Sequence, residues 1–434
     1  MSYNSQDALN FNAAFGNKWS FNYATHLTEN TAGLVTLFMP DGRQDNYIPD
    51  GNGTGNYNGE AGTYNKLVKL GQNSFELRFQ QGGKYVYGVP SGSSSTRPLL
   101  LSVEDRWGYA LQMVYDANLN LTSVTDALGS VTTLEYDANG RITRAWTPDN
   151  RTASWKYDQY GNLTEVIDME GHAFQFTFDG YANVISFNTA QGLWKLAYTD
   201  NGTGTKSVTL TDPLNQNERF YHTGAHVGTT GYQYSYTDKR GMTTAYNAGE
   251  VIEGKGKITK VKLPNGDIST MEYDPNTAQV NSVTDAGNRT TTATYNNQGN
   301  PLTVTDAKAR TYTYTYDSSG LNLTQVKDPQ NNVVATLTYN AYHQPTSVSN
   351  RLNQSTNFSY TNWGAPATTT NIANQTSTNV YDTQGHLTGM QFAGATLASF
   401  TYDAAHRLKT TTDAGNLTTT YAYNNWSSPF KVES

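Results

Sequence analysis

Apolar and polar residues alternate in short runs along most of the chain. Residues 311–316 read TYTYTY and residues 231–236 read GYQYSY, so tyrosine occupies every second position. A period of two places one kind of side chain on each face of a β-strand. These runs are about seven residues long, as in ordinary strands, and are separated by short segments rich in Asp, Asn and Gly. The pattern predicts an all-β chain in which residues 6–15 are the single helical candidate.

A longer repeat is superimposed on this alternation. The dipeptide Tyr-Asp, or a close variant, recurs along the chain with spacings of 21 residues in its first three steps and in its last four. The recurrences begin at Tyr115, Tyr136, Tyr157, Phe178, Tyr198, Tyr273, Tyr295, Tyr316, Tyr339, Tyr360, Tyr381, Tyr402 and Tyr423. Between Tyr198 and Tyr273 the register is lost, around the Gly-rich segment 224–256. A fixed period of this length indicates a repeat architecture.

Each unit contains two tight turns and two strands. Asp137 is followed three residues later by Gly140, as in a type I turn whose Asp carboxylate accepts a hydrogen bond from the backbone two residues on. The glycine takes the left-handed conformation and closes a three-residue hairpin loop. Stacked units would place tyrosine on tyrosine across neighbouring strands. The residues predicted to define the repeat structure are Tyr115, Asp116, Tyr136, Asp137, Gly140, Tyr157, Asp158, Gly161, Tyr316, Asp317, Tyr381, Asp382, Gly385, Tyr402 and Asp403.

The first hundred residues differ from the rest. We expect residues 1–100 to form an irregular β segment that precedes the repeats, and residues 101–434 to form the repeats, with an irregular insertion around 224–256. Strands are predicted at 18–27, 33–39, 66–70, 74–80 and 84–89, and loops at 49–62 and 91–97. No linker separates the two parts, so one continuous β-structure is expected.

Composition narrows the class of protein. Apolar residues make up 36%, charged residues 15% and aromatic residues 12% of the 434 residues, and this aromatic content argues against a disordered chain. The net charge of −7 gives no electrostatic support to a nucleic-acid partner. No apolar run is long enough for a membrane span, and the first residues lack the basic-then-apolar pattern expected of a signal peptide. The absence of cysteine excludes disulfides, thiolate metal sites and a cysteine nucleophile.

The repeat units resemble the YD repeat of the Rhs family. Residues 136–143 read YDANGRIT, residues 157–164 read YDQYGNLT and residues 381–388 read YDTQGHLT. The family includes bacterial polymorphic toxins, the C component of insecticidal toxin complexes and the teneurin shell. The motifs FGNKWS at 15–20 and VEDRWG at 103–108 are similar to the segment that precedes the repeats in bacterial members.

This resemblance implies a strip of antiparallel hairpins that spirals into a curved or hollow β-shell. In the toxins of the family, the shell encloses a C-terminal effector, and the proteins are secreted. A polypeptide cargo is therefore the expected partner, with no nucleic acid and no membrane span. No cofactor is implied.

The chain departs from the family pattern in several places. Leu119, His343 and His406 stand where a turn glycine is usual. The Asp-Pro pairs in the chain lie at repeat turns, and none has the Gly-Leu continuation of the family's self-cleaving core signature. Neither that domain nor a toxin domain follows the repeats, so we expect a fragment or an orphan shell that is not an enzyme.

One segment has the residue types of a calcium loop. Residues 50–60 read DGNGTGNYNGE, with oxygen-bearing side chains at the first, third, fifth and ninth positions and Gly at the sixth. The acid falls at the eleventh position instead of the twelfth, and only two carboxylates are present. The candidate ligands are Asp50, Asn52, Thr54, Asn58 and Glu60, and the competing interpretation is a Gly-Asn loop.

Other chemical candidates have simpler explanations. The repeated Asp residues are accounted for as turn formers, so a carbohydrate-cleaving enzyme would depend on Glu104 and Asp105, the only conspicuous acidic pair. Residues 249–255 match a phosphate-binding loop, but Gly256 stands where Ser or Thr is needed, and a loop followed by a strand at 257–263 is predicted. His222 and His226 are four residues apart, but Gly224 between them argues against a helical metal site.

Two kinds of function, one structural and one ligand-binding, agree best with the sequence. The first is a non-catalytic structural shell that encapsulates another polypeptide. The second is an extracellular module that binds carbohydrate or a receptor through exposed aromatic rows. The residues that test the second class are Trp146, Trp155, Trp194, Trp363 and Trp426, which would otherwise be buried between neighbouring strands.

Overall fold

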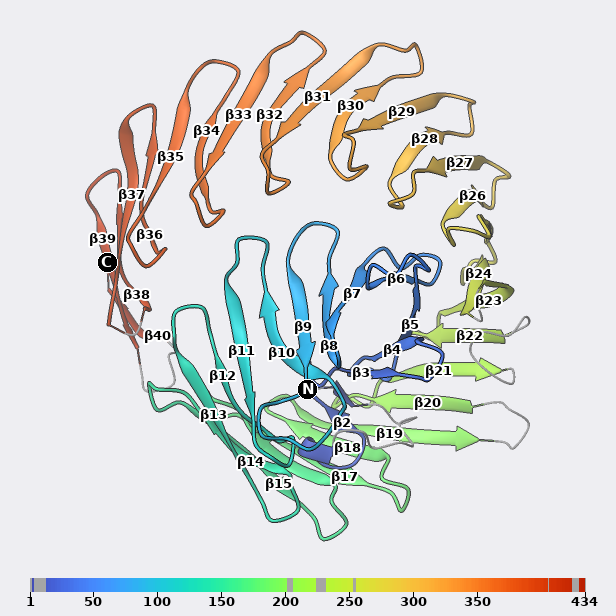
Figure 1. The fold of residues 1–434 in the computed structure, drawn as a ribbon, viewed down its shortest axis with the longest axis vertical. Helices are drawn as coiled ribbons and strands as arrows, with labels where there is room; N and C mark the ends of the chain where they lie inside the picture. The colour runs from blue at the N-terminus through green and yellow to red at the C-terminus, as the bar shows by residue number, and fades with distance from the viewer. Residues whose placement is uncertain are drawn as a thin grey trace.

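The chain folds almost entirely into antiparallel β-structure, as a computed structural model shows (Figure 1). The structure describes residues 2–3, 13–200, 206–223, 232–252, 255–404, 406–423 and 429–433. Its single helical element in these ranges is the 3₁₀ turn η1 (Ala13–Phe15), the end of the predicted helix, whose residues 6–12 lie outside the described part. None of the described helical structure is long and apolar enough to cross a membrane.

The first eight strands of the main sheet close into a small barrel. They are β3 (His26–Glu29), β4 (Val35–Phe38), β5 (Gln44–Pro49), β6 (Asn56–Gly59), β7 (Lys66–Gly71), β8 (Ser74–Arg78), β9 (Lys84–Gly88) and β10 (Leu99–Glu104). Each pairs with the next, and the pair Leu99↔His26 joins β10 back to β3. The segment expected to be irregular is therefore a closed ring, because a strand pair far apart in sequence completes it.

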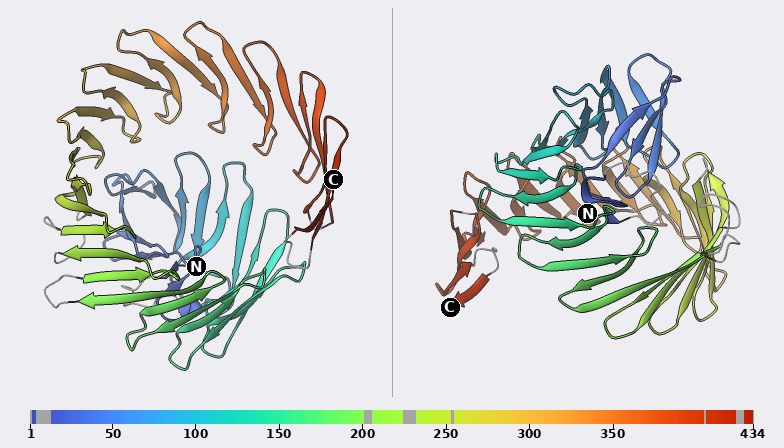
Figure 2. Two further views of the ribbon diagram at one scale, coloured as in Figure 1. Left: turned by 180° about the vertical axis from the view of Figure 1, so that it is seen from behind. Right: turned by 90° about the horizontal axis from the view of Figure 1, so that it is seen from below.

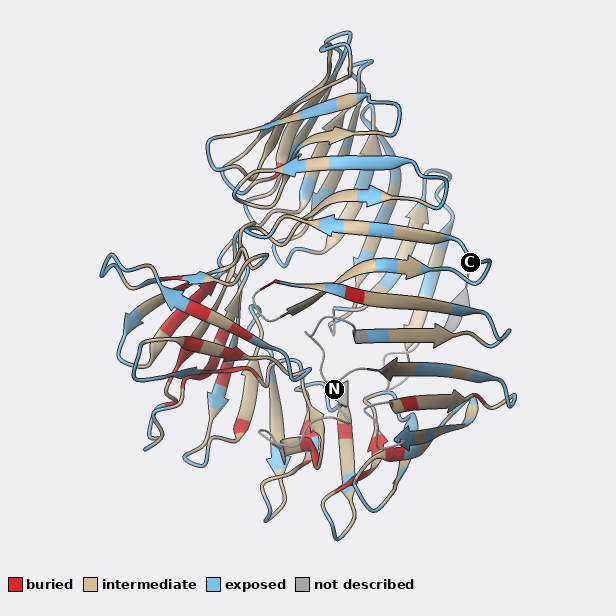
Figure 3. Cartoon of the chain, turned by 90° about the vertical axis from the view of Figure 1, so that its right-hand side faces the viewer, coloured by how far each residue is buried: buried red, intermediate tan, exposed pale blue. Residues whose placement is uncertain are grey.

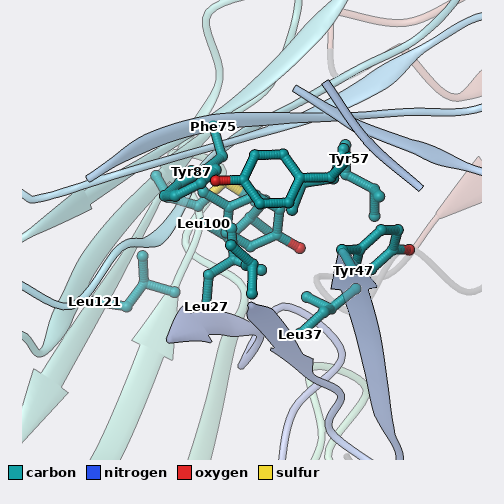
Figure 4. Packing of buried hydrophobic residues seen from close by; sticks show 12 residues of the cluster. Leu27, Leu37, Tyr47, Tyr57, Phe75, Tyr87, Leu100 and Leu121 are labelled. Carbon is teal, nitrogen blue, oxygen red and sulfur yellow. The ribbon is translucent and has the colours of Figure 1, made fainter. Parts of the chain in front are cut away.

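Alternate residues of the barrel strands fill its interior. Leu27, Phe75, Tyr87 and Leu100 are each at most 1% exposed and pack together (Figure 4). Leu67, of the same cluster, is also fully buried. This alternation is the one that the sequence shows, with the apolar positions pointing inward. The barrel therefore supplies the main hydrophobic core of the described structure.

Beyond the barrel, the sheet continues as a strip of hairpins. The strip runs through β11 (Ala110–Tyr115), β12 (Leu121–Thr125), β13 (Val131–Tyr136), β14 (Ile142–Trp146), β15 (Thr152–Tyr157), β16 (Leu163–Ile167), β17 (Ala173–Phe178), β18 (Val184–Thr189), β19 (Gly192–Asp200) and β20 (Lys206–Thr211). It continues through β21 (Asn217–Thr223), β22 (Tyr232–Thr237), β23 (Thr243–Ile252), β24 (Lys255–Lys262), β25 (Ile268–Tyr273), β26 (Val280–Thr284), β27 (Thr290–Tyr295), β28 (Pro301–Thr305), β29 (Thr311–Tyr316) and β30 (Leu323–Lys327). It ends with β31 (Val333–Tyr339), β32 (Pro345–Asn350), β33 (Ser355–Tyr360), β34 (Pro366–Thr370), β35 (Thr376–Tyr381), β36 (Leu387–Phe392), β37 (Ala395–Tyr402), β38 (Leu408–Asp413), β39 (Thr418–Tyr423) and β40 (Pro429–Glu433).

The strip curves into a spiral with the barrel at one end (Figures 1 and 2). A β-bulge recurs at the repeat tyrosines, although not at Tyr198: Glu135 pairs with Arg144, whereas Tyr136 pairs with Ile142. A bulge bends its strand and increases the local twist. Because the bulge returns in equivalent hairpins, the bends accumulate along the strip. The predicted fold class, an all-β spiral of antiparallel repeats, is confirmed.

Local predictions need four corrections. The predicted loop at 49–62 contains β6, which pairs with β5 and β7 and sends Tyr57 into the barrel core. The predicted strand at 18–27 is split into β2 (Trp19–Ser20), which pairs with β1 (Ser2–Tyr3), and β3, because a turn separates them. The predicted loop at 249–255 is wrong, since Ile252 pairs with Lys255 between β23 and β24. Within the expected insertion at 224–256, residues 232–252 continue the ladder, so the sequence period is interrupted but the sheet is not.

Candidate functional site: the shell wall and its seam

The turns of the wall are fixed by the aspartate that follows each tyrosine. The carboxylate oxygen Oδ1 of Asp137 accepts hydrogen bonds from the backbone N–H groups of Asn139 and Arg141, both at 2.9 Å, and Oδ2 accepts one from Arg141 Nε at 2.7 Å. Burial alone would raise the pKa of Asp137, but these bonds hold that pKa below its usual value. Gly140 completes the turn with φ +76°. The aspartates therefore act as turn formers.

The left-handed turn position also accepts other residues. Leu119, His343 and His406, which replace the usual glycine, have φ values of +68°, +60° and +62°. For a residue with a Cβ this conformation costs about 1–2 kcal/mol. The repeat therefore keeps its backbone geometry even where the sequence departs from the motif.

The repeat tyrosines join successive units. The hydroxyl of Tyr136 donates a 2.7 Å hydrogen bond to the carbonyl of Leu121, and Tyr157 donates an equivalent bond to Ile142. Leu121 is itself the strand partner of Tyr115, so each hydroxyl reaches back to the hairpin of the preceding tyrosine. Bonds of the same 15-residue span are made by Tyr115, Tyr273, Tyr295, Tyr360, Tyr381, Tyr402 and Tyr423. The tyrosine hydroxyls thus form a second series of hydrogen bonds between hairpins, the tyrosine ladder, in addition to the backbone hydrogen bonds of the sheet.

The two faces of the wall differ in chemistry. On the tyrosine face, cross-strand neighbours such as Ala293, Val304 and Tyr312 are mainly apolar. On the opposite face, Thr294 and Thr303 share a 2.7 Å hydroxyl hydrogen bond. Similar hydroxyl pairs occur at Thr284–Thr290, Thr305–Thr311, Thr338–Thr346, Ser349–Ser355, Ser359–Thr368, Thr370–Thr376, Thr401–Thr410 and Thr412–Thr418. The wall therefore has an aromatic face and a hydroxyl face.

An N-terminal clamp, residues 13–20, crosses the first repeats. Asn17 Nδ2 donates to the Tyr160 carbonyl at 3.0 Å, and Lys18 Nζ donates to the Tyr181 carbonyl at 2.9 Å. Tyr160 and Tyr181 are 21 residues apart, so successive residues of the clamp contact the same place in successive turns. The Phe15 ring packs edge-on against Trp155 at 5.3 Å between centroids, which covers the tyrosine face here.

A seam joins the turns of the barrel to turns late in the spiral. Gln279 Nε2 donates to the Tyr64 hydroxyl at 2.6 Å, and an Arg106 guanidinium N–H donates to the Tyr342 carbonyl at 2.9 Å. The Trp107 ring lies directly against Gly364, where an added Cβ would overlap it. These contacts span more than 200 residues of sequence. The seam therefore holds the barrel against the far part of the strip.

A cavity with a volume of about 970 Å³ lies beside β19–β23. The tyrosine face contributes stacked rings at Tyr234 and Tyr246, 4.5 Å apart, and a tilted pair at Phe220 and Tyr236, 5.1 Å apart. Lys18 of the clamp also borders the cavity. Aromatic rows of the predicted kind thus line a concave surface.

Four of the five tryptophans proposed for ligand binding lie in the described part of the chain, where they are half-buried and have ring or cation partners. Trp194 stacks on Phe187 at 5.8 Å, and Trp363 packs edge-on against Tyr381 at 6.0 Å. Arg144 lies over Trp146 at 5.1 Å from the ring. Trp155 contacts the clamp, as described above, and Trp426 lies outside the described residues. Glycan or receptor binding through these rings stays a prediction.

The calcium candidates are placed along one loop and the strand that follows it. Asp50 accepts hydrogen bonds from the Asn52 backbone at 2.9 Å and from the Thr54 hydroxyl at 2.9 Å. Asn58 lies in β6, and Glu60 accepts a 2.7 Å bond from Asn46. The loop carboxylates thus have polar partners of their own, and calcium binding stays a prediction.

The remaining candidates lie in turns, in strands or outside the described part. Glu104 ends β10, and Asp105 accepts turn hydrogen bonds from the backbone N–H groups of Trp107 and Tyr109, both at 2.9 Å. His222 lies in β21, whereas His226 is outside the described residues.

One group of metal-ligating side chains comes together within a single turn in the described part of the chain. It consists of Asp168, Glu170 and His172, and it is largely exposed. The pairing of His386 with His406, which lie 20 residues apart at neighbouring turns, was not predicted from the sequence. That spacing, close to the repeat length, is the signal that could have found them.

These features define a repetitive β-wall that winds from a small closed barrel. Residues 115–152, 136–173 and 295–333 match the family model of the RHS repeat, residues 330–433 match the Teneurin YD-shell, and residues 1–47 match a domain of unknown function, DUF6531. These matches confirm the resemblance to the Rhs/YD-repeat family, whose shells are structural. A search of curated proteins found no matching sequence.

Several solved structures are similar to the chain. The TcdB2-TccC3 structure without its hypervariable C-terminal region is 13% identical over 94% of this chain, with a TM-score of 0.45. A TccC3 mutant of the Photorhabdus luminescens Tc holotoxin pore is 14% identical over 94% of this chain, also with a TM-score of 0.45. In both comparisons, the chain spans 26% of the length of the solved chain.

Proposed function

We propose that the chain is the wall of a secreted hollow shell that encloses a polypeptide cargo. The observation that carries this proposal is the single-layered strip with chemically different faces. Its aromatic face is half-buried or exposed from β25 onward, and no described hydrophobic residue of 255–423 is fully buried. Such a face is stable as the lining of a space that another chain occupies.

The clamp indicates which face is inward. Residues 13–20 pack on the tyrosine face at Trp155 and Phe176, and they lie within the arc of the strip in both views (Figures 1 and 2). We infer that the tyrosine face lines the enclosed space and that the hydroxyl face meets solvent. The role is then steric, because an enclosed cargo is kept from its target without any bond chemistry in the wall.

The shape of the purified protein tests the wall. Small-angle scattering with cryo-electron microscopy class averages is expected to show a curved particle with a low-density interior. A solid elongated rod would overturn the shell for this chain.

Enclosure of a cargo needs a separate test. An unfolded reporter polypeptide appended after Ser434 is expected to be cleaved by added protease at least tenfold more slowly than the same reporter on a compact carrier protein. Equal cleavage rates would contradict enclosure while leaving the wall itself intact.

A further inference from the structure

Two histidines from neighbouring turns face each other near the C-terminal end of the strip. His386 Nε2 lies 3.1 Å from His406 Nδ1, and the two rings stack with centroids 4.9 Å apart. His386 Nδ1 lies 2.8 Å from Asp382 Oδ2, and the His386 ring stacks on Tyr402 at 4.6 Å. The His386 side chain is only 15% exposed. Its ring is therefore held on two sides.

The repeat explains why these side chains meet. His386 occupies the fifth position of its turn, from which the side chain reaches the aspartate that opens the turn. His406 occupies the left-handed position of the next turn on the same edge, with φ +62°. Hairpins that are one repeat apart lie side by side, so the two imidazoles come together without any special loop.

The arrangement suits a transition-metal ion. A carboxylate that accepts the Nδ1–H of a histidine fixes the tautomer and leaves the Nε2 lone pair available to a metal. Two imidazole nitrogens bound to one tetrahedral zinc at about 2.0–2.1 Å are about 3.4 Å apart. In this tautomer the 3.1 Å contact is a hydrogen bond from His406 Nδ1 to His386 Nε2. An ion replaces this bond when the His406 proton moves to Nε2 and the two rings separate slightly.

We propose that His386 Nε2 and His406 Nδ1 bind a divalent transition-metal ion of the zinc class, with water completing the coordination. Asp382 is a positioning residue that orients His386. The nearby Arg407 does not oppose the ion, because its Nε donates to Asp403 at 2.8 Å and its guanidinium lies over the Tyr423 ring at 4.7 Å. The ion would join two successive hairpins at their turns.

The chain supplies matched replacements and controls. His386→Asn installs a side chain that the same position carries at Asn162, where it bonds the turn aspartate, and His406→Gly restores the usual turn residue. His172 bonds its turn aspartate as His386 does, and His343 occupies the left-handed position as His406 does. His343 faces the Asn322 amide, however, at 3.0 Å, so neither control residue is part of an imidazole pair.

The test is calorimetric titration of the 434-residue protein with zinc chloride. His386→Asn and His406→Gly are each expected to weaken zinc binding at least tenfold, while His343→Gly leaves it unchanged. His172→Asn removes the histidine of the exposed group Asp168, Glu170 and His172, so it separates binding there from binding at the His386–His406 pair, which it is expected to leave unchanged. Zinc is also expected to raise the thermal unfolding temperature of the unsubstituted protein and of the two controls only. The proposal would be overturned if His386→Asn and His406→Gly both left zinc binding unchanged, or if His172→Asn alone abolished it.

Discussion

The part of the chain around the barrel and the later part of the strip use the same hairpins but are stabilised differently. Most of the fully buried residues lie between Phe15 and Val184, in the barrel and in the repeats next to the clamp (Figure 3). From residue 255 to 423, Gln344 is the only described residue that is fully buried. The later hairpins lack a second layer, so their order depends on hydrogen-bonded turns, the tyrosine ladder and the seam.

The difference shows what a repeat can and cannot provide. Aspartate turns and tyrosine bonds recur in both regions with similar lengths, so they set local geometry in both. Hydrophobic burial scales with the apolar area removed from water, and a single layer removes less of it. We therefore expect the barrel region to be the more stable unit, with the strip opening first.

Removing a barrel core side chain should have the largest effect. Leu67→Ala, at a fully buried position, is expected to lower the stability of the barrel by about 3 kcal/mol, because it leaves a cavity. The matched change Leu337→Ala, at a half-buried strip position, should cost about 1 kcal/mol. Hydrogen exchange of the local amides measures both, and equal losses would contradict the comparison.

Acidification should lower the stability of the barrel, because His26 belongs to the strand pair Leu99↔His26 that closes it. Burial, with a smaller contribution from Arg97, lowers the pKa of His26 from 6.5 to about 4. Because the folded pKa lies below the unfolded one, the stabilisation is complete above about pH 6.5 and is lost as the pH falls toward 4. Between pH 7 and pH 5 the barrel is expected to lose about 2 kcal/mol.

Denaturant unfolding across this pH range, followed by hydrogen exchange in β3 and β10, measures the loss. His26→Gln should remove most of the slope between pH 4 and 6.5, whatever its effect at pH 7. A slope that survives this substitution would place the titrating group elsewhere.

Disturbing the seam should lower stability by less than the changes above, but it should also alter the overall dimensions of the particle. Gly364→Ala places a methyl group against the Trp107 ring at a residue with φ +86° and should cost about 1–2 kcal/mol from the backbone alone. Gly385→Ala has the same backbone strain, with φ +85°, but no barrel residue beside it. Only Gly364→Ala should therefore expand the particle in small-angle scattering and expose Trp107 to a fluorescence quencher. The comparison of the two regions fails if both variants expand equally.

The tyrosine ladder should give the smallest differences. Tyr157→Phe removes a bond to the carbonyl of Ile142, a fully buried residue, and is expected to cost about 1–2 kcal/mol. Tyr381→Phe removes the equivalent exposed bond to Pro366, where water can replace the hydroxyl, and should cost about 0.5 kcal/mol. Amide exchange in the adjoining strands measures each loss. A larger loss for Tyr381→Phe than for Tyr157→Phe would show that the tyrosine hydrogen bonds contribute more stability in the single-layered strip.

The sequence by itself determined the repeating features of this protein. The 21-residue period, the aspartate turns and the alternation of tyrosine with threonine depend on contacts within a hairpin or between adjacent hairpins, which the local sequence specifies. Even positions without the motif glycine, such as Leu119, follow the same geometry, because the neighbouring bonds of the turn remain.

The tertiary structure decided how the strip closes and what it brings together. The pair Leu99↔His26, the clamp on Tyr160 and Tyr181, and the seam at Gly364 join residues that no local pattern relates. The pair Leu99↔His26 closes the barrel before the repeats begin, whereas the seam depends on the accumulated bend of many bulged hairpins. A small change per hairpin would carry the partners apart, so the closure is a property of the whole strip and not of any one unit.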